Sequence, residues 1–409
     1  MKRLIFALIL LGLAVGGLFL WRQPASQAAA EASLLPLLTE EDTAGFARAT
    51  VPNDIVFPRD LGPHPDYQTE WWYYTGNLEG ENGRLFGYQF TIFRRALSAG
   101  ELWGDCAEQG SRGAEEQGGS SPALLPPCPL ASTWRTNQVY LAHFTVSDVA
   151  NDAFYPHERF SRGAAGLAGA QAAPYRVWLE DWSVEEVAPG QVRLLAQAAD
   201  VGLDLTLTQT LPPILHGDGG LSPKGPEPGN ASYYYSLVRQ QTAGTVRVGD
   251  ELVPVTGLSW KDHEYSTSAL SPGAVGWDWF SLQFDDGTAL MFFQIRRADG
   301  TLERFSSGTF IAADGQTTHL DRADWQLDVT ESWTSPTSGA TYPAGWQIRI
   351  PAIGLEIAGE PLMANQELNV STVYWEGAVE FSGTRSGEAV RARGYIEMTG
   401  YAGSMEGRL

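Results

Sequence analysis

A histidine lies between two carboxylates in the segment Trp-Lys-Asp-His-Glu-Tyr at residues 260–265, in a chain with only six histidines. A histidinium, or a carboxyl group that burial keeps protonated, can donate a proton to an alkene. Aromatic faces can then stabilise the resulting cation without reacting with it. We therefore take Asp262 and His263 as a candidate proton-handling pair. Tyr265 is a candidate for the part of the pocket wall that shields the cation, and Trp260 is a candidate ligand contact.

The strand-like context of this segment limits which of its side chains can share a pocket. Successive side chains of a strand point to opposite faces. Asp262 and Glu264 would then face one way. His263 and Tyr265 would face the other way, so only one of the two pairs can line a cavity. The alternative interpretation is that Asp262 and His263 form a satisfied, buried hydrogen-bond pair that closes the junction between two domains.

Glu70 is a second candidate, because it leads four consecutive aromatic residues in the segment 69–77. A carboxylate in such a place is expected to be buried, and a buried acid needs a partner. Arg94, Arg95 or Arg159 could supply that partner, which leaves a pocket acid and a structural ion pair as alternatives. The aromatic side chains should alternate between the inside and the outside of the sheet, and the ligand-binding candidates among them are Trp72 and Tyr74.

The segment Trp-Asp-Trp-Phe at residues 277–280 adds further candidates. Its two tryptophans, Trp277 and Trp279, suit the wall of an apolar pocket, and Asp278 between them could act as an acid. His143 lies in the middle of an apolar strand-like run. A lone strand histidine is more often a satisfied core group than a catalyst, and we keep His143 as a ligand-binding candidate.

Several functional classes lack their signatures in this chain. There is no G-x-S-x-G elbow, no H-E-x-x-H and no paired C-x-x-C, so we expect neither a serine hydrolase of the α/β type nor a metal or cofactor site. A formal net charge of −21 and a pI of about 4.6 argue against nucleic acid as a partner, since binding phosphates requires a basic face.

The first 30 residues are typical of an export signal or an N-terminal membrane anchor. Lys2 and Arg3 precede an apolar run at residues 4–21, and a small-residue, cleavage-like site follows at 28–30. The length of the run leaves cleavage and membrane association through residues 4–21 as alternatives. We expect a linker at 31–54 and a protein outside the cytoplasm, in the periplasm or on the outer face of the membrane.

Both cysteines, Cys106 and Cys128, fall in one Gly-, Ser-, Glu- and Pro-rich segment, which we interpret as a loop inserted at residues 98–132. In an exported protein this spacing favours a disulfide that clamps the loop. The alternative is two unrelated thiols.

Short runs rich in aromatic and β-branched residues, separated by Gly-containing turns, dominate the rest of the chain. The segment 70–95 resembles the segment 277–297: each has a Trp-led strand, an acidic Gly turn and an apolar strand that ends in paired arginines. This internal similarity favours a duplicated β-unit. We therefore predict an all-β protein with two tandem antiparallel β-barrels, at residues 55–267 and 268–409.

Long motifs of the chain resemble the AttH/CrtC-type lipocalin-like family. They include FPRDLGPHPDYQTEWWYYTGNL (57–78), VTGLSWKDHEYSTS (255–268), GWDWFSLQFDDG (276–287), YWEGAV (374–379) and RGYIEMTGY (393–401). The resemblance spans roughly residues 55 to 402 and implies two lipocalin-like barrels in tandem. Relatives in this family include bacterial carotenoid 1,2-hydratases, fungal enzymes that shape polyketide-type substrates, and many exported bacterial proteins.

The resemblance also implies site residues. In the hydratases the matching segment carries an Asp-His pair followed by an aromatic residue, so His263 and Tyr265 carry over. The hydratases also use a carboxylate on a following strand, where this chain has Phe292 or Gln294. An amide cannot protonate an alkene, so Asp278 or Asp262 would have to substitute.

Two functional hypotheses follow. The first is an acid-catalysed hydro-lyase that acts on an isoprenoid or other apolar substrate, with Asp262 and His263 handling protons behind walls of Tyr265 and Trp277. The second is a non-catalytic envelope protein that binds a lipid-like ligand and assists a membrane transporter. Gln294 and the export signal favour the second.

Overall fold

A computed structural model describes residues 43–100, 134–267 and 270–406. The predicted signal or anchor at 1–30 and the predicted Cys106–Cys128 disulfide lie outside the described residues. None of the described helices has the length and apolar character that crossing a membrane requires. The described residues belong to one compact unit.

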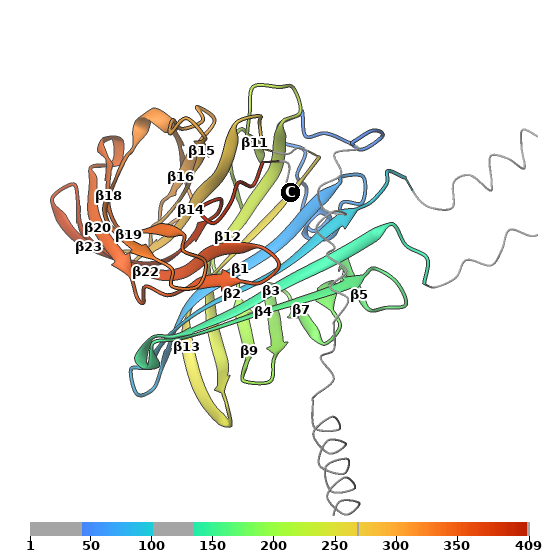
Figure 1. Ribbon diagram of the computed structural model, residues 1–409, viewed down its shortest axis with the longest axis horizontal. Coiled ribbons are helices and arrows are strands. Elements are labelled where there is room, and N and C mark those ends of the chain that lie inside the picture. Colours follow the sequence, from blue (N-terminus) through green and yellow to red (C-terminus); the bar gives the residue numbers. More distant parts are fainter. Residues whose placement is uncertain (1–42, 101–133, 268–269, 407–409) are drawn as a thin grey trace, which may run out of the picture. The chain divides into compact units, whose positions relative to one another are not determined.

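Within the described residues, strands form two antiparallel sheets (Figure 1). The first sheet contains β1 (Thr69–Gly80), β2 (Leu85–Ala96), β3 (Gln138–Asp148), β4 (Ala153–Arg162), β5 (Ala168–Ala172), β6 (Tyr175–Leu179), β7 (Trp182–Ala188), β8 (Gln191–Gln197), β9 (Val201–Thr208), β10 (Ile214–Leu215), β11 (Leu221–Pro223), β12 (Ala231–Val248) and β13 (Glu251–Ser266). The second contains β14 (Ala274–Phe284), β15 (Ala289–Arg297), β16 (Ser307–Ile311), β17 (Thr317–Asp321), β18 (Gln326–Thr334), β19 (Thr341–Ile350), β20 (Leu355–Pro361), β21 (Glu367–Asn369), β22 (Val373–Arg385) and β23 (Glu388–Met398).

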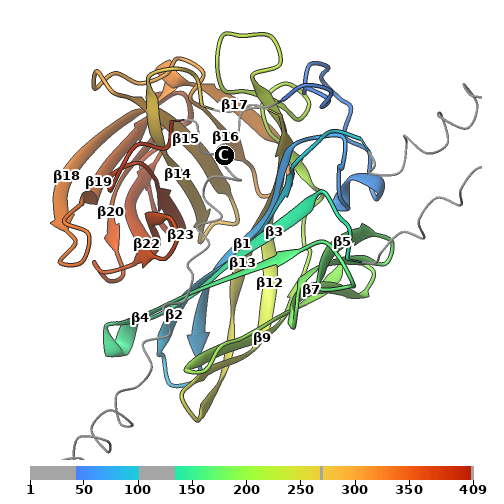
Figure 2. The same ribbon diagram turned by 45° about the vertical axis from the view of Figure 1, so that its right-hand side comes forward.

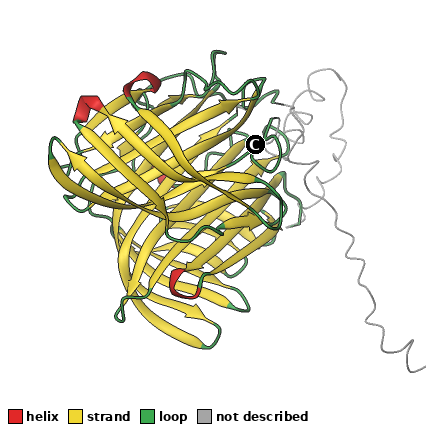
Figure 3. Cartoon of the chain, turned by 60° about the vertical axis from the view of Figure 1, so that its left-hand side comes forward, coloured by secondary structure: helices red, strands yellow, loops and turns green. Residues whose placement is uncertain are grey.

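Helical structure in the described residues is limited to single 3₁₀ turns (Figure 3). They are η1 (Arg59–Leu61), η2 (Val149–Asn151), η3 (Arg322–Asp324) and η4 (Pro351–Ile353). The prediction of an all-β fold with two lipocalin-like antiparallel sheets is therefore confirmed.

The two sheets share one topology. The first runs β4-β3-β2-β1-β13-β12-β9-β8-β7-β6-β5, and the second runs β17-β16-β15-β14-β23-β22-β20-β19-β18. In each, the first strand of the sheet pairs with its last long strand, so the sheet curls round on itself (Figure 2). The two similar hairpins predicted at 70–95 and 277–297 are β1–β2 and β14–β15, which occupy equivalent places in the two sheets.

Alternation along the strands separates three large apolar cores, and a fourth, smaller core contains Tyr235 and Tyr265. Trp72 and Tyr74 of β1 point into the core enclosed by the first sheet. Phe280 and Phe292 lie in the core enclosed by the second sheet. Tyr73 belongs to a third core, which we call the junction because it contains residues of both sheets. The other large side chains of the junction are Tyr234, Trp260, Trp279, Phe293 and Tyr395.

Polar contacts fix the sheets across the junction. The Tyr73 hydroxyl donates to Glu376 Oε2 at 2.8 Å, and the Asn77 amide donates to the Gly394 carbonyl at 3.0 Å. The second sheet thus covers the outer faces of β1 and of the second half of β13, and β13 is buried on both faces from Ser259 to Ser266.

Removing a fully buried ring of the second core should destabilise the protein strongly. Phe292 has no exposed surface, and its ring stacks on Phe280 with centroids 4.4 Å apart. We expect Phe292→Ala to reduce the free energy of unfolding by about 3–5 kcal/mol, measured by urea denaturation. Phe310→Ala, at a partly exposed position of the same sheet, is the matched control and should cost clearly less. Equal losses would contradict this account of the core.

Candidate functional site

The inner face of β1 and β13 gathers several of the predicted residues. In the pairing of these strands Glu70 lies opposite Tyr265, Trp72 opposite His263 and Tyr74 opposite Lys261. All six positions share one face by alternation, and it is the face that encloses the first core. The structure therefore brings together the predicted residues His263, Tyr265, Glu70, Trp72 and Tyr74.

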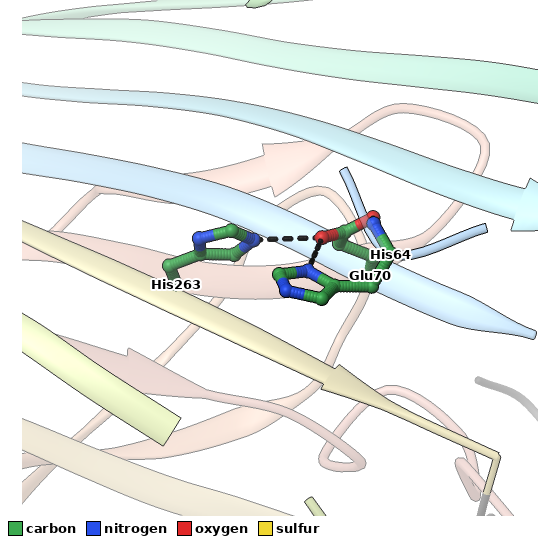
Figure 4. Close-up of side chains that lie close together, drawn as sticks. All are labelled: His64, Glu70 and His263. Carbon is green, nitrogen blue, oxygen red and sulfur yellow. Dashed lines mark hydrogen bonds and ion pairs between the residues drawn. The ribbon is translucent and has the colours of Figure 1, made fainter. Parts of the chain in front are cut away.

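Glu70 is the centre of this inner-face cluster. Its carboxylate has no exposed surface and accepts hydrogen bonds from Arg94 Nε at 2.8 Å and from the His64 backbone amide at 3.0 Å. Its Oε1 lies 2.7 Å from His64 Nδ1 and 2.8 Å from His263 Nε2 (Figure 4). Burial alone would raise the pKa of Glu70, but Arg94 and the two histidines hold that pKa well below its ordinary value. Of the three arginines considered from the sequence, Arg94 is the partner.

The pKa values of the two histidines on Glu70 are shifted in opposite directions. Burial lowers the pKa of His263 to about 3, so its imidazole is neutral, and its Nδ1 lies 2.9 Å from the Tyr235 hydroxyl. Burial opposes a charge on His64 too, but hydrogen bonds to Asp60 and Glu70 raise its pKa. This lowered pKa disfavours the histidinium form that the first hypothesis requires of His263.

His64 was not among the predicted residues. It lies in the loop between η1 and β1, with Nε2 3.1 Å from Asp60 Oδ1 and its ring stacked on Tyr265 at 3.5 Å between centroids. The motif at 57–78 contained this histidine six residues before Glu70. That spacing was the only signal in the sequence that could have found it.

Asp262 lies on the opposite face of β13, in the junction. It accepts hydrogen bonds from Tyr234 at 2.7 Å, from Trp260 at 2.6 Å and from Ser236. Burial raises its pKa to about 7. The predicted alternation is therefore seen, but Asp262 and His263 neither bond to each other nor face a common space. They do not form the proton-handling pair of the first hypothesis or the buried pair of its alternative.

The junction contains two further carboxyl groups, which the sequence analysis missed. Glu376 of β22 and Glu397 of β23 lie directly opposite each other on paired strands. Directly opposite residues have Cβ atoms about 5 Å apart on one face. Each falls in a motif that carried the family resemblance, as a single acid among apolar residues. That pattern was the available signal.

These two carboxyl groups differ in environment. Glu376 has no exposed surface, and one of its oxygens accepts from the Tyr73 hydroxyl. The other oxygen, Oε1, has no hydrogen-bond partner among the described residues. Burial, with the charge of Glu397 adding to it, raises the pKa of Glu376 well above its ordinary value. Glu397 is half-buried and accepts from Trp277 Nε1 at 2.8 Å.

Glu397 titrates near neutral pH. Burial raises its pKa to about 7, and the charges of Asp262 and Glu264 contribute to the rise. Glu264 forms an ion pair with Lys224 at 3.0 Å. The junction thus holds four carboxyl groups that face one another from both sheets. Burial raises the pKa of three of them, Asp262, Glu376 and Glu397, and neighbouring negative charge adds to each rise.

The other predicted residues lie in different places. Asp278 is at the edge of the second core, bonded to Arg296, Gln294 and Tyr401. Trp260, Trp277 and Trp279 lie in or against the junction core. His143 is also between the sheets, with Nδ1 2.6 Å from the Tyr374 hydroxyl and Nε2 3.0 Å from Glu158.

A groove of about 950 Å³ opens between the sheets, further along the strands that carry the acid pair. Glu380 and Arg393, which lie opposite each other four cross-strand pairs beyond Glu376 and Glu397, form part of its wall. Its other charged lining residues are Arg239, Asp285, Glu331, Glu360 and Arg391. The predicted site residues are not part of its lining.

Two curled antiparallel sheets of one topology, packed through an aromatic junction, define a tandem lipocalin-like protein. The AttH-like family model matches residues 48–401, and the chain belongs to that family. An AttH-type structure from Nitrosomonas europaea is 33% identical, covers 87% of this chain and 100% of its own, and has a TM-score of 0.71. The family resemblance found in the sequence is thereby confirmed.

Two fungal proteins are more distantly similar. Dehydratase asqC of Emericella nidulans is 27% identical over 221 residues, which are 51% of this chain and 60% of asqC. The match therefore spans less than two thirds of that relative. The structure of kievitone hydratase from Nectria haematococca shares 14% identity, covers 88% of this chain and 98% of its own, and has a TM-score of 0.61, a likeness of fold.

Glu70 should be needed for stability, because its loss leaves Arg94 buried without a counter-charge. We expect Glu70→Gln to reduce the free energy of unfolding by about 3–5 kcal/mol in urea denaturation. The matched control is Glu79→Gln, which removes an exposed glutamate–arginine pair, Glu79–Arg393 at 3.0 Å. That control should cost at most about 1 kcal/mol. Similar losses in both variants would contradict the inner-face assignment.

The raised pKa of Asp262 should be visible as a pH dependence of stability. Between its ordinary pKa of 3.8 and its folded value of about 7, the folded chain keeps a proton that the unfolded chain has lost. The contribution of Asp262 to stability therefore falls as pH rises through this window and is constant above it. The substitution Asp262→Asn should remove this pH-dependent decrease in stability.

Urea denaturation of both proteins at several pH values measures this effect. From about pH 4 to about pH 7 the free energy of unfolding of the variant should rise relative to the wild type by a few kcal/mol at most. Parallel pH profiles would show that Asp262 is ionised in the folded protein.

Proposed function

We propose that the chain is an exported enzyme of the hydro-lyase type, which adds water to, or removes it from, an apolar, isoprenoid-like molecule at the junction. The observation that carries the proposal is the acid pair Glu376–Glu397. Glu376 is a buried carboxyl group with a raised pKa and one unpartnered oxygen. Glu397 beside it titrates at about pH 7 and is half-buried.

Such a pair can divide the proton transfers of hydration. Glu376 donates its proton to one alkene carbon, and the positive charge develops on the adjacent carbon. A water molecule attacks that carbon and gives up a proton to the Glu397 carboxylate, so that one hydrogen and one hydroxyl have been added. Transfer of the proton from Glu397 to Glu376, directly across the strand pair, restores the starting state. Dehydration is the same sequence reversed.

The surroundings of the pair suit a neutral, apolar substrate. The rings of Tyr73, Trp279 and Tyr395 lie in the same core and can shield a developing cation. Trp71 and Trp277 are partly exposed and pack against that core, on the side where Glu397 is also half-exposed. An anionic substrate would meet four carboxyl groups, of which Glu264 is paired with Lys224.

The acid pair also explains how this chain could work without the carboxylate that the hydratases have where it has Phe292 or Gln294. The hydratases to which the sequence is similar place an acid on the strand that here is β15. In this chain Phe292 fills the second core, and the Gln294 amide donates to Asp278. The carboxyl groups would instead come from β23, the other neighbour of β14, and from β22 beyond it. The similarity to dehydratase asqC supports the reaction class.

A second candidate is a non-catalytic envelope protein that binds a lipid-like ligand and assists a membrane transporter. The signal-like residues 1–30 favour it, since hydration of an isoprenoid does not require export. In that case Trp71 and Trp277 would hold the apolar part of the ligand, and Glu397 would bind its polar end.

The two candidates differ in turnover. The full-length chain is incubated with squalene, an acyclic isoprenoid with isolated alkenes, in buffer made with D₂O and ¹⁸O-labelled water, and the products are analysed by mass spectrometry. An enzyme of the proposed type yields an alcohol with one ¹⁸O and one carbon-bound deuterium. Binding without such a product supports the second candidate.

Variants then test the acid pair. Glu376→Gln should reduce turnover by roughly 10²- to 10⁴-fold, while squalene still quenches tryptophan fluorescence. Glu380→Gln, an exposed position on the same strand and face, is the matched control and should keep wild-type turnover. Full activity of Glu376→Gln would remove that residue from the mechanism.

A further inference from the structure

Three side chains of the inner-face cluster present donor atoms to one point. His64 Nδ1, Glu70 Oε1 and His263 Nε2 all lie within 4.8 Å of one another (Figure 4). We propose that these residues bind one divalent transition-metal ion, Zn²⁺ foremost. The site is separate from the proposed acid pair Glu376–Glu397, which lies on the junction side of β13 with Asp262, whereas His263 lies on the opposite face.

The donor set is chemically suited to zinc. Two imidazole nitrogens and one carboxylate oxygen form a set found in zinc enzymes, in which a fourth position remains for water. Imidazole donors also favour the later first-row ions over magnesium or calcium. Metal–donor distances of about 2.0–2.1 Å in a tetrahedral site require donors about 3.3 Å apart. The present distances of 2.7 and 2.8 Å from Glu70 would have to widen by about half an ångström.

Each ligand already has the outer partner that a metal site requires. The other nitrogen of His64, Nε2, lies 3.1 Å from Asp60, and the other nitrogen of His263, Nδ1, lies 2.9 Å from the Tyr235 hydroxyl. These contacts fix the rings so that His64 Nδ1 and His263 Nε2 face Glu70. The second carboxylate oxygen of Glu70 accepts from Arg94. Such outer hydrogen bonds orient ligands and are a regular feature of metal sites.

The position of the cluster allows an ion to enter. Glu70 and His263 have no exposed surface, whereas 14% of the His64 side chain is exposed. His64 lies in the loop after η1, so a small movement of that loop can open the donors. The Tyr265 ring, stacked at 3.5 Å, and the Trp72 ring, 4.9 Å from His263, form an apolar wall around the other side.

Without a metal ion, contacts between His64 and the carboxylates of Asp60 and Glu70 hold the same groups together. A saturable, one-to-one affinity for a dication therefore distinguishes the proposed metal site from a purely hydrogen-bonded network.

The test uses the untagged full-length chain after removal of metals with EDTA. Titration with Co²⁺ should give the strong visible absorption of a tetrahedral site and saturate at one ion per chain. Zn²⁺ should abolish that absorption, and competition with a chromogenic chelator measures its affinity. Absence of a saturable one-to-one signal in the wild-type protein would overturn the proposal.

Variants assign the ligands. His64→Ala and His263→Gln should each weaken Zn²⁺ binding by on the order of 100-fold or more, since loss of an outer partner alone costs 10- to 100-fold. The matched control is His143→Gln: this buried histidine also contacts a carboxylate, Glu158 at 3.0 Å, but no third donor joins them in the described part of the chain.

The control variant should bind like the wild type. Circular dichroism verifies that each variant folds. If His263→Gln does not fold, the affinity of His64→Ala, which lies at a partly exposed loop position, tests the ligand assignment. Wild-type affinity in His64→Ala, or an equal loss in His143→Gln, would place the ion elsewhere and overturn the assignment.

Discussion

The burial of β13 on both faces is the constraint on which the rest of the structure depends. Every residue from Ser259 to Ser266 is buried, and four of the eight are ionisable in the segment 261–264. A charge taken out of water must be paired or neutralised. The two faces meet this requirement differently. On the inner face Arg94 and His64 surround Glu70, and its pKa falls. On the junction face Asp262 has hydroxyl and indole donors but no ion pair among the described residues, and its pKa rises.

Because the two sheets share one topology, equivalent positions can be compared. The comparison shows which features of the Glu70 site are found in one sheet only. The pair Asp278–Arg296 at the start of β14 occupies a place similar to that of Glu70–Arg94 at the start of β1. Two residues further along the strands, however, Phe280 pairs with Ile396 where the first sheet pairs Trp72 with His263. The second sheet therefore keeps a structural ion pair at its edge and an apolar core behind it. The paired imidazoles of His64 and His263 therefore belong to the first half alone.

Much of this arrangement could be predicted from local pattern, and the remainder required the tertiary structure. Alternation placed Trp72 and Tyr74 inside, and separated Asp262 from His263, because a strand repeats every two residues. The need for a counter-charge on Glu70 followed from its aromatic neighbours. His64 could not be placed, since the path of a loop sets its position. Glu376 and Glu397 were missed because their environment depends on Tyr73, more than 300 residues away in the sequence.

The acidity of the junction is a property of the two sheets together. Glu376 and Glu397 come from the second sheet and Asp262 and Glu264 from the first. Burial raises the pKa of Asp262, Glu376 and Glu397, and neighbouring carboxyl groups add to each rise. Separating the sheets would hydrate these three groups and lower their pKa values. The weakly acidic carboxyl groups of the junction therefore depend on the packing of one sheet against the other.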